Sequence, residues 1–474
     1  ERPEVASRDA SWSAPADTRA IDPEPWRGLG DPLLVELIER AASHNLDLRQ
    51  AEARLREARA GRDVAAGRRL PDLAATGSAT RQQLSENGQL PFDRFPGFDR
   101  SFSLFDVGFD ASWEIDLWGG TRRAVEAATR RMAAAAAEHQ DVRLRVVAEV
   151  ERTYAELRGA QAEAAVLAAE AATQRRLADL MRQRRNAGEV ALSDEAQAEA
   201  QAHSAEAALP GIEAQIHAAA HGLAVLTGQP PEALRERLLK PAVLPLPPAQ
   251  VSAGLRSDIL RRRPDVIAAE AQLAAAIADV GVETANLFPQ ISLIGSVGQQ
   301  ARGGTDLLSS GSTRYQLGPM LRWPIFSDGR IRAQIRAADA RADAAAAQYE
   351  QAVLAALADS ETALNRYNAA VAAAREMGIA REQAAKALAL AEQRYTSGED
   401  DLLQYLLEQS RFNGIARVAA TTERDRLVAH AALVKALGGG WQGQSGDPAD
   451  EGSAQGFSAN RPKDNQPNEV GAGS

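Results

Sequence analysis

The chain contains no cysteine among its 474 residues, which excludes both a disulfide framework and a thiolate metal site. It also lacks any run of about twenty apolar residues, and this absence argues against a membrane-spanning helix. Contact with a membrane would therefore have to come through strands. Aromatic residues make up only 5% of the chain, whereas alanine is abundant. This composition favours helices that pack closely through small side chains.

Positive charge is not concentrated anywhere in the sequence, and the net charge is −10. A nucleic-acid partner usually requires a basic face or stripe, so this distribution argues against one. Hydrophobic residues at 45% and charged residues at 25% exclude a wholly disordered chain. The first residue is Glu1 and no apolar leader follows it. We therefore expect a processed or trimmed chain whose targeting signal is not included.

Two halves of the sequence repeat one another in order. Upstream, an offset of 218 positions pairs Asp47 with Asp265 and Pro71 with Pro289. Downstream the offset is 210, and the difference of eight residues falls between about 78 and 112. Because low complexity does not produce ordered tryptophan, proline and glycine pairs, we interpret 45–230 and 263–440 as two copies of one unit. The pairs at the offset of 210 include Trp113 and Trp323, Gly119 and Gly329, Gly188 and Gly398, and Gly228 and Gly438.

Both copies predict the same order of elements. A first helix, over 45–69 and 264–287, ends at a proline, which forbids its continuation. Two strands follow, at about 72–82 and 102–117 in one copy and about 290–300 and 314–326 in the other. A run of about 65 residues then predicts on the order of 100 Å of helix. Gly188 and Gly398 break these runs, and helices return over 193–227 and 402–437, so each copy ends in a helical hairpin.

Three segments lie outside the two copies. We assign residues 1–44 to an N-terminal segment and 231–262 to a linker between the copies. Residues 441–474 are rich in glycine, serine, asparagine and proline. Such a composition has almost nothing to bury, so we predict a flexible tail there.

The predicted strands alternate between apolar and polar residues. Phe105, Phe109 and Trp113 fall on one face of the 102–117 strand, and its acidic residues fall on the other. On the fourth strand Tyr315 and Trp323 stand eight residues apart on the apolar face, as aromatic girdles at two membrane interfaces do. A soluble sheet packed on helices fits this alternation equally well. Four strands cannot close a barrel, so a membrane location requires several chains to pool their strands.

The stretch at 255–298 carries a family resemblance. It reads LRSDILRRRPDVIAAEAQLAAAIADVGVETANLFPQISLIGSVG and closely resembles the signature of outer-membrane efflux factors of the TolC and OprM type. The hairpin tips AGEVALSDEAQAEAQ and SGEDDLLQYLLEQ resemble that family's periplasmic tips, and the internal duplication agrees. The resemblance covers about residues 25–440 and points to the lipoprotein branch that serves resistance-nodulation-division multidrug pumps.

The resemblance implies a mixed α and β membrane protein that forms a homotrimer. Four strands from each chain would make a twelve-stranded barrel in the outer membrane, with the aromatic residues named above facing lipid. The long hairpins would form a periplasmic tunnel, and the N-terminal segment, the linker and the C-terminal region would form an equatorial belt. The lipid-bearing cysteine of that branch is absent here, so an acyl anchor would lie upstream of Glu1 or have been removed.

The implied function is passive export of drugs or other small molecules, with no cofactor. The implied partners are a periplasmic adapter protein and an inner-membrane resistance-nodulation-division transporter, which supplies the energy. Docking to the adapter would involve tip residues of both hairpins, although the tip glycines also suit a helix end with positive φ. These docking candidates are Gly188, Glu189, Val190, Gly398 and Glu399.

Closing such a tunnel requires contacts near the tips that can be undone. Asp194 and Tyr395 match family positions, and we hypothesise that Tyr395 donates a hydrogen bond to Asp194 and holds the inner hairpin closed. Leu403 matches a hydrophobic constriction ring of OprM-like members. One turn further, where the family has an inward acid, this chain has a leucine, so a nearby acid would substitute or the gate would be mainly apolar. Any of these acids could instead be a solvated helix residue. The remaining gate candidates are Asp400, Asp401, Leu407 and Glu408.

Other functional classes find less support in the sequence. An enzyme would need a catalytic constellation, and the chain has no glycine-rich phosphate loop, Gly-x-Ser-x-Gly motif or cysteine nucleophile. His217 and His221 have zinc-ligand spacing, but the sequence offers no third ligand. A soluble coiled-coil scaffold would share the alanine-rich helices without explaining the amphipathic strands. A type I protein-secretion conduit would have the same fold, and the 255–298 signature favours drug efflux over it.

Overall fold

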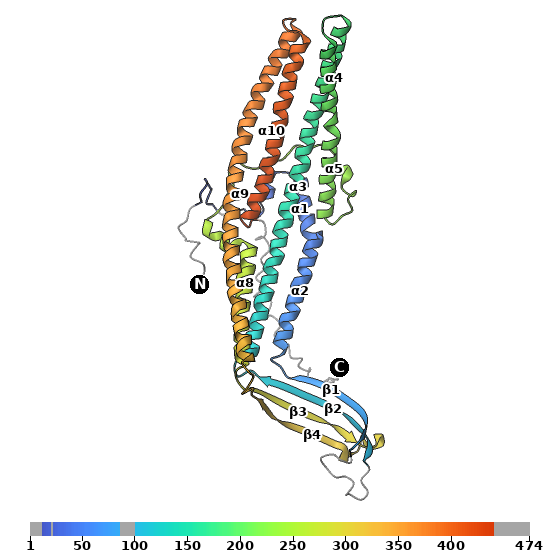
Figure 1. The fold of residues 1–474 in the computed structure, drawn as a ribbon, viewed down its shortest axis with the longest axis vertical. Coiled ribbons are helices and arrows are strands. Elements are labelled where there is room, and N and C mark those ends of the chain that lie inside the picture. The colour runs from blue at the N-terminus through green and yellow to red at the C-terminus, as the bar shows by residue number, and fades with distance from the viewer. Residues whose placement is uncertain (1–11, 20–21, 86–99, 440–474) are drawn as a thin grey trace, which may run out of the picture.

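The computed structural model describes residues 12–19, 22–85 and 100–439. Long helices run along most of the molecule, and a single sheet extends from one end of them (Figure 1). The hairpin tips lie at the opposite end. The predicted tail at 441–474 lies outside the described residues.

The four predicted strands form one antiparallel sheet in the order β1-β2-β3-β4. The fourth strand ends four residues earlier than the predicted 326. Pro324 has no backbone N–H to donate to a ladder, so pairing stops before it. The strands are β1 (Asp72–Gln83), β2 (Ser101–Ile115), β3 (Gln290–Ala301) and β4 (Thr313–Arg322).

The helices follow the duplicated order. Both long helices contain 67 residues, and no helix in the described part of the chain is long and apolar enough to cross a membrane. The first copy contains α2 (Leu46–Gly67), α3 (Gly120–Asn186), α4 (Leu192–Ala207) and α5 (Leu209–Leu226). The second contains α8 (Pro264–Ala285), α9 (Arg330–Thr396) and α10 (Leu402–Ala436). Outside the two copies lie α1 (Pro32–His44), α6 (Arg235–Leu238), α7 (Ile259–Arg262) and 3₁₀ turns at Pro25–Leu29 and Arg256–Asp258. Two further 3₁₀ turns, Gly304–Asp306 and Ser310–Ser312, lie between β3 and β4 in the second copy.

The first hairpin differs from the prediction in its returning segment. We expected one helix over 193–227, but the structure divides it into α4 and α5 at Ala208. Pro210 lies in the first turn of α5. It cannot donate to the carbonyl four residues earlier, and its ring crowds that carbonyl. The second hairpin has Ala420 at the equivalent position, and α10 runs through without a break.

The duplicated glycines adopt equivalent conformations. All six residues of the pairs Gly119/Gly329, Gly188/Gly398 and Gly228/Gly438 have positive φ. A Cβ on Gly228 would stand 2.5 Å from the carbonyl oxygen of His44, and a Cβ on Gly438 would stand 3.2 Å from that of Arg262. Residues 44 and 262 are themselves related by the offset of 218. In both copies, therefore, the end of the hairpin packs against the residue two positions before the first helix of the unit.

The core lies at mid-height, where α1 and the stretch around α6 pack on α3 and α5. Leu34, Val150, Tyr154 and Leu223 are fully buried there. Tyr154 donates a hydrogen bond of 2.5 Å to Asp31, the N-cap of α1. Burial, with this contact to Asp31, raises the pKa of Tyr154 to about 12. The tyrosine thus anchors the N-terminal segment to the long helix in its neutral form.

The N-terminal segment and the linker also touch on the other side of the molecule. Asp17 and Ser252 form an isolated parallel bridge, and the Trp12 indole donates 2.9 Å to the carbonyl of Gly254. Beside them, a smaller apolar cluster joins these segments to Tyr367 of α9 and Leu433 of α10. Segments far apart in sequence therefore meet around the middle of the helical body.

Candidate functional site

The sheet has one apolar face that no other described part of the chain covers. In the ladder, Phe109 of β2 lies opposite Val297 of β3, which lies opposite Tyr315 of β4. More than half of Phe109 and 84% of Tyr315 is exposed. Exposed apolar patches of this kind mark contacts with a membrane or with another protein.

The five predicted belt residues all fall on this apolar side, but at different heights. Trp113 and Trp323 lie where the sheet meets the helices, and their indoles donate to the carbonyls of Arg69 (3.0 Å) and Leu287 (3.2 Å). Trp113 and Trp323 occupy equivalent positions in the two copies, and so do the residues whose carbonyls they bind. The structure places Trp323 just beyond β4 rather than within it. Phe105 is half-buried and lies further along β2, beside Ala301 of β3.

The opposite face of the sheet is polar. Asp106 of β2 lies at its centre and pairs with Arg314 of β4 across the intervening strand, at 2.5 and 2.8 Å. Gln300 donates a further hydrogen bond of 2.8 Å to Asp106. Towards β1, the hydroxyl of Thr76 donates 2.9 Å to Asp110. The sheet is thus a wall with one apolar and one polar side.

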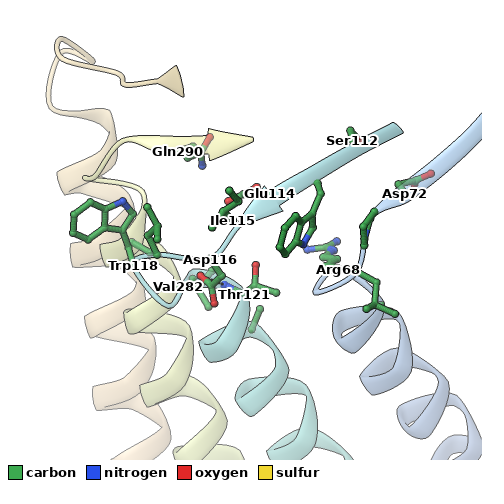
Figure 2. A pocket seen from close by; sticks show the side chains of 18 of the residues that line it. Arg68, Asp72, Ser112, Glu114, Ile115, Asp116, Trp118, Thr121, Val282 and Gln290 are labelled. Carbon is green, nitrogen blue, oxygen red and sulfur yellow. Dashed lines mark hydrogen bonds between the residues drawn. The ribbon is translucent and has the colours of Figure 1, made fainter. Parts of the chain in front are cut away.

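A cavity lies where the sheet joins the helices. Figure 2 shows it surrounded by side chains from the ends of β1, β2 and β3 and from α2 and α8. On one side Trp118 stacks on Phe288, with ring centroids 4.7 Å apart, and donates 2.8 Å to the carbonyl of Pro289. Asp116 accepts the backbone N–H of Thr121 at 3.1 Å and thereby caps the start of α3. These contacts fix the direction in which the sheet leaves the helical body.

The two hairpin tips have the same backbone geometry. Gly188 follows α3 in the left-handed conformation, and the N–H of Glu189 donates 2.9 Å to the carbonyl of Arg184. In the second tip, Gly398 and the bond from Glu399 to Arg394 repeat this pattern at the same distance. This is a glycine-terminated helix end of the Schellman type. Gly188, Glu189, Gly398 and Glu399 are exposed and Val190 is half-exposed, so the docking candidates lie at the surface.

Just below each tip, a pair of side chains joins the two helices of the hairpin, and this pair differs between the two hairpins. In the first hairpin Arg185 forms an ion pair with Glu195 across the turn. The duplicate positions are Tyr395 and Tyr405, whose rings stack with centroids 5.6 Å apart. Further ion pairs from Arg175 and Arg182 join α3 to α4. The first hairpin is therefore held by charge, and the second by an aromatic stack at the matching position.

An ion pair joins the two tips. Arg184 of α3 donates 2.7 Å to Asp401, the N-cap of α10. Asp401 also accepts the N–H of Gln404 at 3.0 Å. The bond from Gln404, and after it the pair with Arg184, lowers the pKa of the Asp401 carboxyl below its usual range. Sequence reasoning chose Asp401 but missed Arg184. The available signal was its duplicate Arg394, which pairs within its own tip with Asp400 at 2.9 Å.

The remaining gate candidates do not come together as predicted. Asp194 accepts the N–H of Ala191 at 3.0 Å, whereas Tyr395 stacks as described above. The predicted hydrogen bond between Tyr395 and Asp194 is absent from the described part of the chain. Asp194 lies in the first turn of α4, where its carboxylate satisfies a free backbone N–H.

Leu403 and Leu407 lie one turn apart on the same side of α10, and Glu408 follows Leu407. Leu403 packs on the apolar cluster of α3 and α4 that contains Ala178, Met181 and Ala202. Leu407 is 37% exposed, and Glu408 pairs with Arg411 on the same helix. Within this chain, Leu403 is thus a contact between the two hairpins.

Polar contacts continue down the junction of α3 and α10 below the tips. Glu170 accepts a hydrogen bond of 2.9 Å from Asn413, and Glu163 accepts one of the same length from Arg417. Deeper in, His430 and Glu151 form a buried pair at 2.5 Å. The two hairpins are therefore joined by a ladder of side-chain pairs whose last rung is Arg184 with Asp401.

The two histidines with zinc-ligand spacing lie on successive turns of α5. The ring centroids of His217 and His221 are 6.3 Å apart. No group of three or more histidine, aspartate and glutamate side chains in the described ranges could hold a metal ion.

Comparison with known proteins places this geometry among outer-membrane channels. A profile described as "Outer membrane efflux protein" matches residues 37–229 and 255–439. The pyoverdine export outer membrane protein OpmQ of Pseudomonas aeruginosa is 33% identical, over 88% of this chain and 87% of OpmQ. The solved structure of the outer-membrane channel OprN has a TM-score of 0.81 at 35% identity, covering 93% of this chain and 99% of OprN. VceC of Vibrio cholerae has a TM-score of 0.78 at 30% identity, covering 89% and 100%.

Proposed function

The chain belongs to the outer membrane efflux protein family, and from this we propose that it is the outer-membrane channel of a tripartite efflux pump. It would conduct small molecules passively from the periplasm to the exterior and catalyse no reaction itself. The observation that supports this best is the two-faced sheet at the end of the helical stalk. An apolar face towards lipid and a polar face towards water are what a membrane-spanning barrel wall requires.

The state of the sheet edges supports a trimer. Within one chain, β1 and β4 pair on one side only, which leaves a row of backbone N–H and C=O groups on each outer edge. Such groups cannot face hydrocarbon without partners. Pairing β4 of one copy with β1 of the next removes both edges. Three copies give twelve strands, which exceeds the roughly eight needed to enclose a lumen.

The free ends of the hairpins support docking to a partner in the periplasm. In a trimer, six tips of like backbone geometry would form one ring. We propose that this ring binds a periplasmic adapter protein, and that the adapter connects it to an inner-membrane resistance-nodulation-division transporter. Glu189 and Glu399 are exposed beside the tip glycines, so the complementary surface of the adapter would be polar or basic.

We also propose a gate at the tips. Arg184 and Asp401 tie the first hairpin to the second at the tip end of the body, where a change in the spacing of the hairpins in a ring would change the size of the opening. Asp400, paired with Arg394, and the stacked Tyr395 would stabilise the second tip itself. This assignment replaces the predicted bond between Tyr395 and Asp194 as the contact between the hairpins.

The absence of cysteine allows a direct test of the closed ring. Ala74 of β1 and Gln316 of β4 lie in the same ladder row on the polar face. Two strands separate them within a chain, so they are about 14 Å apart. Barrel closure staggers the strands, so Ala74→Cys should be combined in turn with a cysteine at each position along the polar face of β4 (314 to 322), and Gln316→Cys with one along that of β1 (72 to 82). In detergent with a short bismaleimide, at least one combination should give covalent dimers and trimers, and none should give anything larger.

Each single-cysteine variant is the matched control. If β1 of one copy pairs with β4 of the next, no single variant should cross-link to a trimer. If every combination remains monomeric, or if one gives a ladder running beyond three copies, the closed trimer would be contradicted.

A further inference from the structure

The charged residues of the sheet are unequally divided between its faces. The strand register places four carboxylates on the polar face, and they lie on β1 and β2. Within the strands, the same face carries two guanidinium groups, both on β4. A third, that of Arg302, follows β3 and lies over the ring of Phe102 at the far end of this face. The six strand residues are Asp72, Asp106, Asp110, Glu114, Arg314 and Arg322.

Only one of these carboxylates is neutralised by an arginine. Asp106 is paired with Arg314 and bonded to Gln300, and just 16% of its side chain is exposed. Asp110 is exposed and accepts a bond from the uncharged Thr76. Glu114 is exposed four residues along the same strand. Counting Asp72 and Arg322 as well, the four strands leave 3 negative charges and 1 positive charge on this face of each chain. Arg302 adds a second positive charge beyond the end of β3, beside Phe102 and away from Asp110 and Glu114.

The charge of this face would act on any ion that passes along it. At 0.1 M ionic strength a charge is screened over roughly 10 Å. Asp110 and Glu114 are about 13 Å apart along the strand, so an ion midway between them lies about 7 Å from each, within that screening length. Rings of aspartate or glutamate side chains around a pore favour cations over anions.

We propose that the polar face of the sheet makes the lumen of the channel cation-selective, and that Asp110 and Glu114 determine this preference. The inference rests on the proposed function, because it requires that this face line a closed pore. Asp106 contributes little to the preference while Arg314 neutralises it. Cationic compounds would therefore pass the sheet more readily than anionic compounds of the same size.

The ratio of potassium to chloride permeability tests the proposal. It is obtained from the reversal potential of the purified channel in a planar bilayer across a tenfold gradient of KCl. The unmodified channel should have a ratio above one, which falls as total salt is raised because screening grows. The double variant Asp110→Asn with Glu114→Gln should lower the ratio by at least twofold. Arg314→Gln should raise it, because it frees the charge of Asp106.

Arg81 provides the control. It lies on β1 opposite Ser103, on the apolar side of the sheet, so Arg81→Gln removes a charge that the lumen does not face. This variant should leave the ratio unchanged. Steady currents whose ratio does not respond to the double variant, or responds equally to Arg81→Gln, would overturn the inference while leaving the channel function intact. The absence of currents from all variants would overturn both.

Discussion

A position can require glycine because its φ is positive or because it has no space for a Cβ, and Gly188 and Gly228 distinguish these two reasons. Both have positive φ, a conformation that costs other residues roughly 1–2 kcal/mol. A Cβ on Gly188 would meet nothing within 4 Å, whereas one on Gly228 would stand 2.5 Å from the backbone oxygen of His44. A backbone atom at the junction of α1 and α2 cannot move aside as a flexible side chain can.

We predict that Gly228→Ala destabilises the protein more than Gly188→Ala. The tip variant should lose about 1–2 kcal/mol from backbone strain alone, and the Gly228 variant should lose this amount and the cost of the clash besides. Thermal unfolding of both proteins in the same detergent, followed by circular dichroism, measures the difference. Equal losses of stability in the two variants would show that the close packing against His44 adds nothing to the cost of the substitution.

At this scale the sequence predicted backbone conformation better than side-chain partners. The six duplicated glycines could be identified by comparing the two copies, because positive φ is a local requirement that glycine meets. The duplication also marks Arg184 through its counterpart Arg394, but it does not show that Arg184 binds Asp401, which is 217 residues away. The same limit applies to Asp194, whose carboxylate within this chain accepts a backbone N–H three residues away and not the hydroxyl of the distant Tyr395.

The two hairpins are similar elements that are held together differently. Ion pairs join α3 to α4, and the matching rung between α9 and α10 is an aromatic stack. If the tips separate, the ion pair that must break between them is Arg184 with Asp401. Exposed pairs of this kind are worth about 0.2–1 kcal/mol each, so the gate would open at modest cost.

We predict that Asp401→Arg raises the open probability of the channel a few-fold and that the double exchange Arg184→Asp with Asp401→Arg restores it. The single change places two positive charges together, and the exchange restores the attraction. Single-channel recordings measure the open probability. Arg394→Gln is the control, because it breaks a pair within the second tip only. If the exchange does not reverse the effect of the single change, the ion pair does not hold the gate closed.

The pH dependence of the same recordings gives an independent check. The pKa of Asp401 is lowered in the folded tip, so its contribution is fully present above the usual aspartate value of about 3.9. It is lost as the pH falls through the lowered pKa. Open probability should therefore rise below about pH 4, and Asp401→Asn should abolish that rise.

The order of the elements followed from the sequence, but one interruption did not. Proline and glycine mark the ends of most elements, so the boundaries of both hairpins and all four strands were predicted to within a few residues. Pro210 was nevertheless placed inside a single helix, because the surrounding alanine-rich segment is strongly helical. The resulting break distinguishes the first hairpin from the second, in which no proline interrupts α10.

In the part that the structure describes, one chain leaves the apolar face of its sheet uncovered and the backbone groups on both sheet edges unpaired, so the whole molecule requires further partners. Alternation in the strands predicted the two faces, and the number of strands predicted that copies must combine. Neither could reveal the pairing of Asp106 with Arg314, which depends on the ladder register across β3. The net charge of the polar face therefore depends on how the strands pair in the sheet, although the charged residues themselves can be listed from the sequence.

Single-channel conductance in a planar lipid bilayer tests the central claim most directly. The protein should be purified in detergent and its mass shown to be that of three chains before it is added. We predict discrete current steps from the trimer, small and mostly closed at neutral pH. A protein that stays soluble as a monomer or dimer without detergent and never produces current steps would contradict an outer-membrane channel.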